Sequence, residues 1–337
     1  MRVVTFGEVM LRLAPEGYQR FVQAETFGAS FGGAEANVAV DLCGLGMNAA
    51  FVTRLPAHEI GQAAVNALRR YGVDTSHIQR GGSRVGLYYC EKGASQRPSK
   101  VIYDRAGSSI AQAEPGMFDW DAVLEHASWF HFTGITPALS ESCAALCLEA
   151  CRAARRRGLP VSCDLNYRNN LWSRARAGEV MGGLAPNLTL LIANEEDAAD
   201  VFDIHAAGTD VDRGTLSREG YASVARQLSE RFGIPEIAIT LRQSISASDN
   251  LWSAMLFTAG ECYFSREYPV HIVDRVGGGD SFGAGLIYAA GMPPQERLEF
   301  AVAASCLKHS IEGDFNLVSA EEVQKLAGGS ASGRISR

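Results

Sequence analysis

Short apolar runs alternate with longer amphipathic segments along most of the chain. Glycine follows several of the amphipathic segments directly, as at Gly46, Gly72 and Gly158, which is common where a helix ends before a strand. The pattern predicts helices over 34–45, 60–71, 141–156 and 221–232, and strands over 3–7, 49–53, 129–133, 161–164, 188–193 and 237–240. This alternation predicts an α/β fold with a doubly wound, mainly parallel sheet flanked by helices. Such sheets bind ligands at the edge formed by the C-terminal ends of their strands.

Two segments depart from this alternation. Residues 9–33 and 84–106 contain short alternating runs separated by glycine and polar residues, and neither has the pattern of a helix. We expect them to form a small β lid beside the main sheet. We therefore expect one α/β domain over 1–326 that includes this lid, followed by a flexible tail over 327–337 that is rich in glycine and serine.

Composition and charge exclude several classes of protein. The 31 basic and 38 acidic residues give a net charge of −7, which disfavours general binding to nucleic acid. No apolar run is long enough to cross a membrane, and the first residues lack the pattern of a signal peptide. None of the eight cysteines forms a CxxC pair, so we expect them to be reduced and packed as small apolar side chains. We expect a cytoplasmic protein that binds neither nucleic acid nor membranes.

The strongest chemical signal is a glycine-rich segment that runs into a helix. Gly277, Gly278 and Gly279 precede Asp280 in the first helical turn. Their backbone N–H groups and the positive end of the helix would form an anion pocket, where the acid could accept a proton from a hydroxyl group. Two further glycines inside this helix, Gly283 and Gly285, indicate that something approaches its backbone closely. The alternative is a flexible loop in which Asp280 caps the helix.

Three other clusters lie where ligands are expected. Gly33 and Asn37 begin a helix of small residues, either as a tight turn or as a site of close approach to a polar ligand. The segment 164–168 places an acid, an amide and Arg168 after a strand. The segment 194–197 follows the next strand, and its acids could anchor Mg²⁺ through water or simply charge a helix N-terminus. No Gly-Lys pair is present, which excludes a Walker A loop.

The paired motifs Gly32-Gly33-Ala34-Glu35-Ala36-Asn37 and Asp274-Arg275-Val276-Gly277-Gly278-Gly279-Asp280-Ser281-Phe282 resemble the signature of PfkB-type (ribokinase-like) sugar kinases. The resemblance covers residues 1–326 and implies a ribokinase-like fold. Several stretches, among them 103–108, 134–139, 164–168 and 307–316, are similar to the 2-keto-3-deoxygluconate kinases of that family. The chain departs from the family pattern where Arg275 replaces Thr, Gly278 replaces Ala and Asp197 replaces Glu.

The resemblance implies ATP-dependent phosphorylation of a sugar-acid hydroxyl, with 2-keto-3-deoxygluconate converted to 2-keto-3-deoxy-6-phosphogluconate. It implies that Asp280 is the base and that Gly277, Gly278 and Gly279 hold the transferred phosphoryl group. The sugar-binding residues it implies are Gly33, Asn37, Tyr88, Tyr103, Arg105 and Arg168. For ATP they are Asn194, Thr240, Arg242, Gly277, Gly279 and Lys308. Asn194 and Asp197 would hold Mg²⁺ through water, and a monovalent cation would lie near Asp274.

The charge of the sugar site argues for an acid. Ribose and fructose have no charge that would require both Arg105 and Arg168, whereas Arg binds a carboxylate through a bidentate fork. The alternative is that one or both arginines pair with structural acids such as Asp104. Other readings are a fructokinase, ribokinase or nucleoside kinase of the same family, or a non-catalytic sugar-acid sensor, against which the retained Asp280 argues. We also expect a homo-oligomer, a dimer that pairs through the lid.

Overall fold

The computed structural model describes residues 1–209 and 217–329, and its centre is a nine-stranded sheet. Along the sheet the strands follow the order β14-β13-β12-β11-β10-β9-β1-β4, with β15 beside β13. Their bounds are β1 (Arg2–Phe6), β4 (Asn48–Val52), β9 (Trp129–Thr133), β10 (Val161–Asp164), β11 (Leu190–Ala193), β12 (Glu236–Ser244), β13 (Asp249–Thr258), β14 (Glu261–Phe264) and β15 (Tyr268–His271). Neighbouring strands in the series β4-β1-β9-β10-β11-β12 are parallel. Strand β13 is antiparallel to its neighbours β12, β14 and β15.

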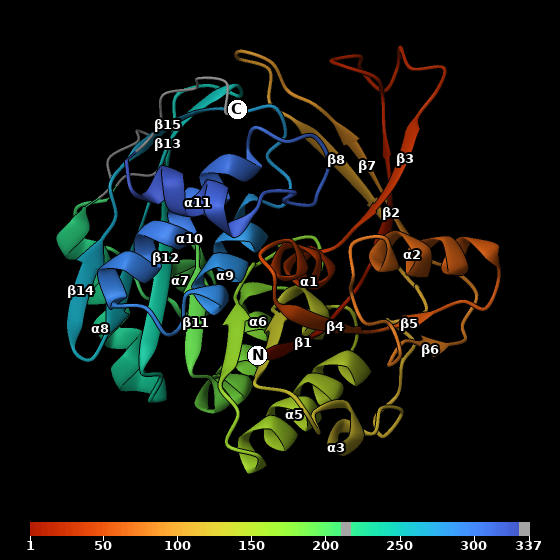
Figure 1. The fold of residues 1–337 in the computed structure, drawn as a ribbon, viewed down its shortest axis with the longest axis horizontal. Coiled ribbons are helices and arrows are strands. Elements are labelled where there is room, and N and C mark those ends of the chain that lie inside the picture. Colours follow the sequence, from red (N-terminus) through yellow and green to blue (C-terminus); the bar gives the residue numbers. More distant parts are fainter. Residues whose placement is uncertain (210–216, 330–337) are drawn as a thin grey trace.

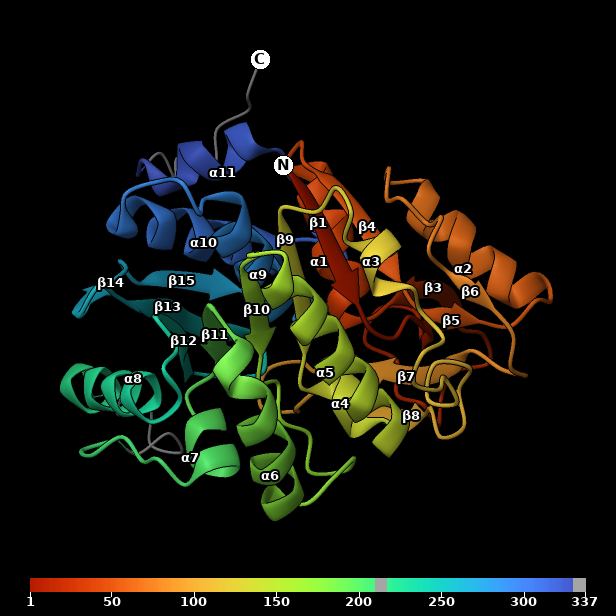
Figure 2. The ribbon, with the colours of Figure 1, turned by 90° about the horizontal axis from the view of Figure 1, so that it is seen from below.

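Helices cover both faces of the sheet (Figure 2). On one face lie α1 (Ala34–Gly44), α2 (Glu59–Arg69), α9 (Gly278–Tyr288), α10 (Pro294–Lys308) and α11 (Ala320–Ala327). The other face carries α3 (Trp120–Val123), α4 (Ile135–Ala138), α5 (Glu141–Arg156), α6 (Arg174–Leu184), the 3₁₀ turn Ala185–Asn187, α7 (Asp197–Phe202) and α8 (Arg218–Phe232). Because both faces are covered, the central strands are almost wholly buried, which explains their continuous apolar sequences.

A separate small sheet projects from the main body (Figure 1). Its strands are β2 (Met10–Ala14), β3 (Gly28–Gly32), β7 (Gly86–Glu91) and β8 (Lys100–Asp104), in the order β3-β2-β7-β8. All four lie within the two segments that the sequence sets apart, and they form the predicted lid. A short parallel pair, β5 (Arg54–Leu55) and β6 (Gln79–Arg80), lies beside α2. The predicted ribokinase-like fold, with its main sheet and lid, is thereby confirmed.

Most predicted elements agree with the structure, and the C-terminal part of the sheet differs. The bounds of β9, α5 and β10 are those that the sequence predicts. The strand predicted over 237–240 instead runs to Ser244 and turns back into β13, so that an antiparallel edge extends the parallel sheet. Helix α11 ends at Ala327, at the start of the predicted tail, and residues 330–337 of that tail lie outside the described part of the chain. Among the residues that the structure describes, no helix is both long enough and apolar enough to cross a membrane.

Candidate active site

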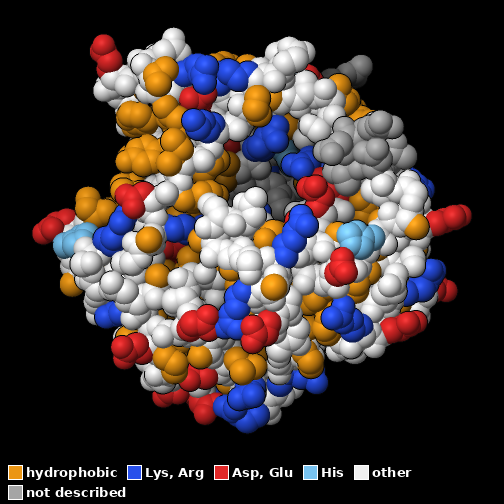
Figure 3. Space-filling view, turned by 180° about the vertical axis from the view of Figure 1, so that it is seen from behind, with side chains coloured by type: hydrophobic (Ala, Val, Ile, Leu, Met, Phe, Trp, Pro, Cys, Tyr) orange, Lys and Arg blue, Asp and Glu red, His pale blue; other side chains and the backbone are white. Residues whose placement is uncertain are grey.

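A cavity of about 510 Å³ opens between the lid and the C-terminal edge of the parallel strands. Figure 3 shows the molecule hollowed on this face, with Lys and Arg side chains around the opening. The cavity wall contains nearly every residue that the sequence predicts for the site: Gly33, Asn37, Tyr88, Tyr103, Arg105, Arg168, Asn194, Asp197, Thr240, Arg242, Gly277, Gly278, Gly279 and Asp280. Lys308 is the predicted residue that does not line it. Segments far apart in the sequence therefore meet at one site.

The glycine segment forms a tight turn at the start of α9. Gly277 has φ of +87°, a left-handed conformation that favours glycine. A Cβ atom on Gly277 would come within 2.0 Å of the carbonyl oxygen of Asp314, so no other residue fits there without movement. The first amides of a helix have no acceptor within the helix. The Gly278 amide donates to the carbonyl oxygen of Arg275 at 3.3 Å, and all four residues from Gly277 to Asp280 line the cavity. We call residues 277–280 the anion loop.

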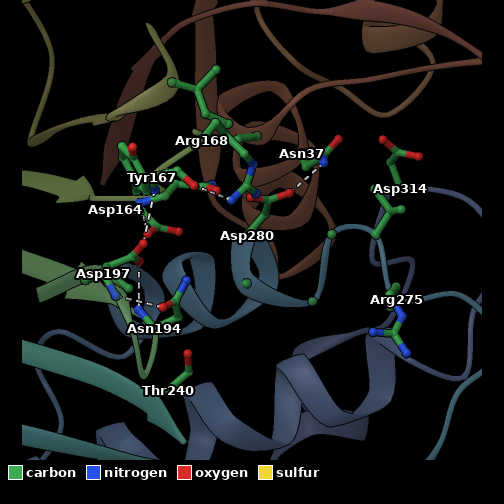
Figure 4. A pocket seen from close by; sticks show the side chains of 18 of the residues that line it. Asn37, Asp164, Tyr167, Arg168, Asn194, Asp197, Thr240, Arg275, Asp280 and Asp314 are labelled. Atoms are coloured by element: carbon green, nitrogen blue, oxygen red, sulfur yellow. Dashed lines mark hydrogen bonds between the residues drawn. The ribbon is translucent and has the colours of Figure 1, made fainter. Parts of the chain in front are cut away.

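Asp280 is held at the end of this loop by Asn37. Its Oδ2 accepts a hydrogen bond of 2.6 Å from Asn37 Nδ2, and Asn37 Oδ1 accepts one of 3.2 Å from the Gly33 amide (Figure 4). Burial raises the pKa of Asp280 to about 7, while the Asn37 amide acts in the opposite direction. A carboxyl group that ionises near neutral pH is suited to act as a general base.

Arg105 lies at the lid end of the cavity and is already paired. Its Nε and Nη2 donate to Glu8 Oε2 at 2.8 and 2.5 Å, and the Ser108 hydroxyl donates to Glu8 Oε1 at 2.6 Å. The partner acid is therefore Glu8, on the segment after β1, whereas Asp104 pairs with Arg84. The guanidinium also lies over the ring of Tyr103, 5.2 Å from its centroid. The guanidinium N–H groups of Arg105 that do not donate to Glu8 are available to a ligand.

Arg168 and Tyr88 have different surroundings. Arg168 Nη1 donates to the carbonyl oxygen of Tyr167 at 2.9 Å, and its side chain points toward Asp280 (Figure 4). The Tyr88 hydroxyl donates to Asp314 Oδ2 at 2.5 Å, and Tyr88 is almost fully buried. Of the two, Arg168 is placed to contact a ligand near the base, and Tyr88 forms part of the cavity wall.

The opposite end of the cavity is built from β11, β12, β13 and the C-terminal end of α10. Thr240 and Trp252 line it, and Arg242 pairs with Glu195 at 3.0 Å. The rings of Trp252 and His309 lie 4.9 Å apart between centroids. His309 Nδ1 donates to the carbonyl oxygen of Ser305 at 2.7 Å, and burial lowers the pKa of His309 to about 4, so the ring is neutral. The two ring planes are inclined by 58°. An aromatic wall of this kind beside a basic side chain suits a nucleotide base.

Two acids, Asp164 and Asp197, form the wall between the two ends. Asp197 accepts the backbone amides of Tyr167 at 3.1 Å and Asn194 at 2.9 Å, and Asn194 Oδ1 in turn accepts the Asp197 amide at 3.0 Å. Burial raises the pKa of Asp164, and the nearby Asp197 and Asp280 raise it further. Buried acids that repel one another fit a bound cation. Among residues 1–209 and 217–329, however, no cluster of three or more acidic, His or Cys side chains could hold a metal by itself.

Lys308 lies beneath the anion loop instead of in the cavity wall. It is fully buried, its Nζ donates to the carbonyl oxygen of Ile311 at 3.0 Å, and burial lowers its pKa. A Cβ atom on Gly277 would lie 3.1 Å from its Cε. The structure thus places Lys308 as a support for the loop, and a direct contact between Lys308 and ATP stays a prediction.

The glycines inside α9 have a reason other than a ligand. A Cβ atom on Gly285 would come within 2.7 Å of the Ala301 Cα atom on α10, so Gly285 allows the two helices to pack closely. A Cβ atom on Gly283 would meet only Ile192 Cδ1, at 3.4 Å. The sequence predicts that something approaches the backbone of this helix closely, and at Gly285 that neighbour is helix α10. The anion loop itself does not depend on that inference.

The anion loop, the buried carboxyl group of Asp280 and the aromatic wall thus line one cavity. A model of the "pfkB family carbohydrate kinase" matches residues 1–318. The chain is 33% identical over 332 residues to the 2-dehydro-3-deoxygalactonokinase of Haloferax volcanii. This alignment covers 98% of each chain. The crystal structure of 2-dehydro-3-deoxygluconokinase from Thermotoga maritima is 49% identical, with a TM-score of 0.94 and 98% of each chain covered. The 2-dehydro-3-deoxygluconokinase of Thermoproteus tenax is 28% identical over 93% of this chain and 89% of its own.

The chain belongs to the pfkB family of carbohydrate kinases. It is a sugar kinase, a phosphotransferase with an alcohol group as acceptor, as the sequence motifs predict.

Several residues of the site were not singled out from the sequence. Glu8, Glu35, Trp252, His309 and Asp314 all line the cavity. Glu35 Oε1 accepts hydrogen bonds from the Thr133 amide at 2.9 Å and from two threonine hydroxyls. The sequence does contain a signal for most of these residues. Glu8 follows the predicted strand 3–7, Glu35 lies inside the motif 32–37, and His309 and Asp314 lie inside the stretch 307–316. Trp252 and His309 reach the cavity only through the β12–β13 hairpin and the packing of α10.

Proposed function

We propose that this kinase transfers the γ-phosphoryl group of ATP to the 6-hydroxyl of 2-keto-3-deoxygluconate. The observation that carries the proposal is the position of Asp280, a buried base with a pKa of about 7, at the end of the anion loop and in a cavity that Arg105 and Arg168 also line. The names of the relatives in Thermotoga maritima and Thermoproteus tenax support a sugar acid as substrate.

The reaction follows from this geometry. The sugar hydroxyl lies against Asp280, which accepts its proton as the hydroxyl oxygen attacks the γ-phosphorus. The bond between that phosphorus and the β,γ-bridging oxygen breaks, and ADP leaves. The amides of the anion loop donate to the oxygens of the phosphoryl group during transfer, when negative charge is spread over these oxygens. The lid closes the cavity to water, which limits hydrolysis of ATP.

Nucleotide and magnesium take the other end of the cavity. Thr240, Arg242, Trp252 and His309 line that end of the cavity, and Asn194 lines it as well. We assign the first four to the nucleotide and Asn194 to the phosphate side. Asp164, Asp197 and the Asn194 segment would hold Mg²⁺ through water, because the Asp197 oxygens already accept two amides. When bound, Mg²⁺ neutralises charge on the phosphate oxygens.

The carboxylate of the sugar acid pairs with Arg168 and with the part of Arg105 that Glu8 leaves available. The relative from Haloferax volcanii is named for the C4 epimer of the same acid, so both epimers belong in the test. A neutral sugar would leave unpaired the guanidinium N–H groups that Glu8 and the Tyr167 carbonyl do not already accept. This loss costs about 1–3 kcal/mol, and each 1.4 kcal/mol is about tenfold in kcat/KM.

The experiment is a coupled assay of ADP release with 2-keto-3-deoxygluconate, its C4 epimer, fructose, ribose and adenosine. We expect the two keto acids to exceed the neutral sugars by about 10²-fold or more in kcat/KM. Arg168→Lys and Arg105→Ala should reduce that preference, and Arg84→Ala, outside the cavity, should not. A wild type that prefers fructose, ribose or adenosine would refute the sugar-acid assignment. Sugar-acid binding without ADP release would indicate a sensor.

We also propose that the protein is a cytoplasmic homodimer that pairs through the lid. On the outer strand β8, Val101 and Ile102 are 38% and 44% exposed, and β8 is an edge of the small sheet. An exposed edge strand with apolar side chains favours pairing with a second copy. Light scattering of the wild type and of Ile102→Asp tests this, and a wild-type monomer at micromolar concentration would contradict it.

A further inference from the structure

A buried ionic cluster lies beneath the anion loop and joins it to the lid. Arg12, on lid strand β2, donates from Nη2 to Asp274 Oδ2 at 2.6 Å and from Nη1 to Asp314 Oδ1 at 2.7 Å. All three side chains are only 2–3% exposed. One guanidinium therefore bridges two carboxylates from distant parts of the chain.

The remaining carboxylate oxygens of this cluster also have donors within the protein. Asp274 Oδ2 accepts the Gly313 amide at 3.1 Å as well, and its Oδ1 accepts the Val276 amide at 3.2 Å. Asp314 Oδ2 accepts the Tyr88 hydroxyl. Each Asp274 oxygen thus has a protein donor, and a guanidinium lies against it. These surroundings do not fit the monovalent cation that the sequence resemblance places near Asp274.

We propose that Arg12 takes the place of that cation and holds the anion loop in its active shape. Asp274 precedes the loop directly, and Gly277 packs against the backbone of Asp314, so the two carboxylates that Arg12 bridges fix the two sides of the turn. The planar guanidinium fork holds the two carboxylates in a fixed geometry, which an ammonium group on a flexible stem does not impose. The cluster also makes the base of the lid and the loop one unit.

Arg12 is a positioning residue, because it is not among the residues that line the cavity. Its loss displaces the amides that stabilise the transferred phosphoryl group. The effect therefore falls on kcat, while KM for sugar and ATP changes little. The inference rests on the kinase activity and not on the identity of the sugar, since the assay uses whichever sugar the wild type phosphorylates.

The experiment compares Arg12→Lys and Asp274→Asn with Arg84→Lys as the matched control. Arg84 also pairs with an aspartate near the lid, Asp104, but this pair is partly exposed and outside the cavity. We expect Arg12→Lys to lower kcat by about tenfold or more with KM within about threefold of wild type, and the control to match wild type. Melting curves identify a variant that fails to fold. If Arg12→Lys fails to fold, the kcat of Asp274→Asn decides the test, because asparagine is almost the same size as aspartate.

A second arm measures wild-type kcat in potassium chloride and in equimolar tetramethylammonium chloride. The two rates should agree, because Arg12 already supplies the positive charge at Asp274. If potassium raised the kcat of the wild type by about fivefold or more, the proposal would be overturned. Such a gain would show that a cation from solution, and not Arg12 alone, stabilises the transition state. A folded Arg12→Lys protein with kcat within about twofold of wild type would also overturn it.

Discussion

Replacement of Asn37 by alanine tests how the base is tuned. The Nδ2 group of Asn37 donates to Asp280 Oδ2 at 2.6 Å and favours the ionised form, against the effect of burial and of the acids Asp314 and Glu35. Without this donor the pKa of Asp280 rises above its wild-type value of about 7. The base must be ionised to accept a proton, so the acid limb of kcat/KM moves to higher pH.

The hydrogen bond sets the size of the effect. A hydrogen bond to a charged group contributes about 1.5–3 kcal/mol, and about 1.4 kcal/mol corresponds to one pH unit, so the limb should move by about 1–2 pH units. At about pH 7.5, the ionised fraction of Asp280 would then fall about 3- to 25-fold. The loss should largely disappear by about pH 10, where both proteins are ionised.

The assay is the pH profile of kcat/KM by ADP release between about pH 6 and pH 10. Asn66→Ala is the control, because Asn66 is exposed on α2 and its side chain accepts a hydrogen bond from Gln62 there. The reasoning is refuted if Asn37→Ala lowers kcat/KM equally at every pH, since Asn37 would then serve substrate binding and not the ionisation of Asp280.

Three further results are expected. Sugar binding should slow hydrogen exchange in the lid segments 9–33 and 84–106, whose short strands have low local stability, and unchanged exchange would remove lid closure from the mechanism. Gly277→Ala should lower kcat and Tm together because its Cβ meets the Asp314 backbone, whereas Gly283→Ala should leave both near wild type; equal effects would contradict the geometry. Asp280→Asn should raise Tm more at about pH 8.5 than at about pH 5. The buried acid favours folding only while it is protonated, and that contribution is lost as the pH rises through its folded pKa. A Tm gain that does not depend on pH would argue against the raised pKa.

The sequence predicts the parallel sheet and the anion loop for physical reasons. Strands such as β9 and β11 are buried on both faces, so their sequences, WFHFT and LLIA, are mainly apolar. The predicted strands end at Thr133 and Ala193, as they do in the structure. The loop is predictable because Gly277 needs a left-handed backbone that other residues avoid, and because Asp280 follows at a fixed distance in the same segment.

Contacts across long distances in the sequence could not be predicted in this way. The partner of Arg105 is Glu8, 97 residues away, and not its chain neighbour Asp104. The buried position of Lys308 depends on how α10 packs beneath the loop, and periodicity does not show which face of a buried helix meets a ligand. The antiparallel hairpin of β12 and β13 was missed because the short predicted strand continues into polar residues.

The most direct test of the account is single-turnover transfer from γ-labelled ATP to 2-keto-3-deoxygluconate by wild type and Asp280→Asn. Calorimetry first establishes that both proteins bind ATP and the sugar acid within a few-fold of each other. The wild type should then form the 6-phosphorylated acid, and Asp280→Asn should form it about 10²–10⁴ times more slowly, the usual contribution of a general base. A rate for Asp280→Asn within about threefold of wild type would contradict the assignment of Asp280 as the base, and with it the mechanism built on the anion loop.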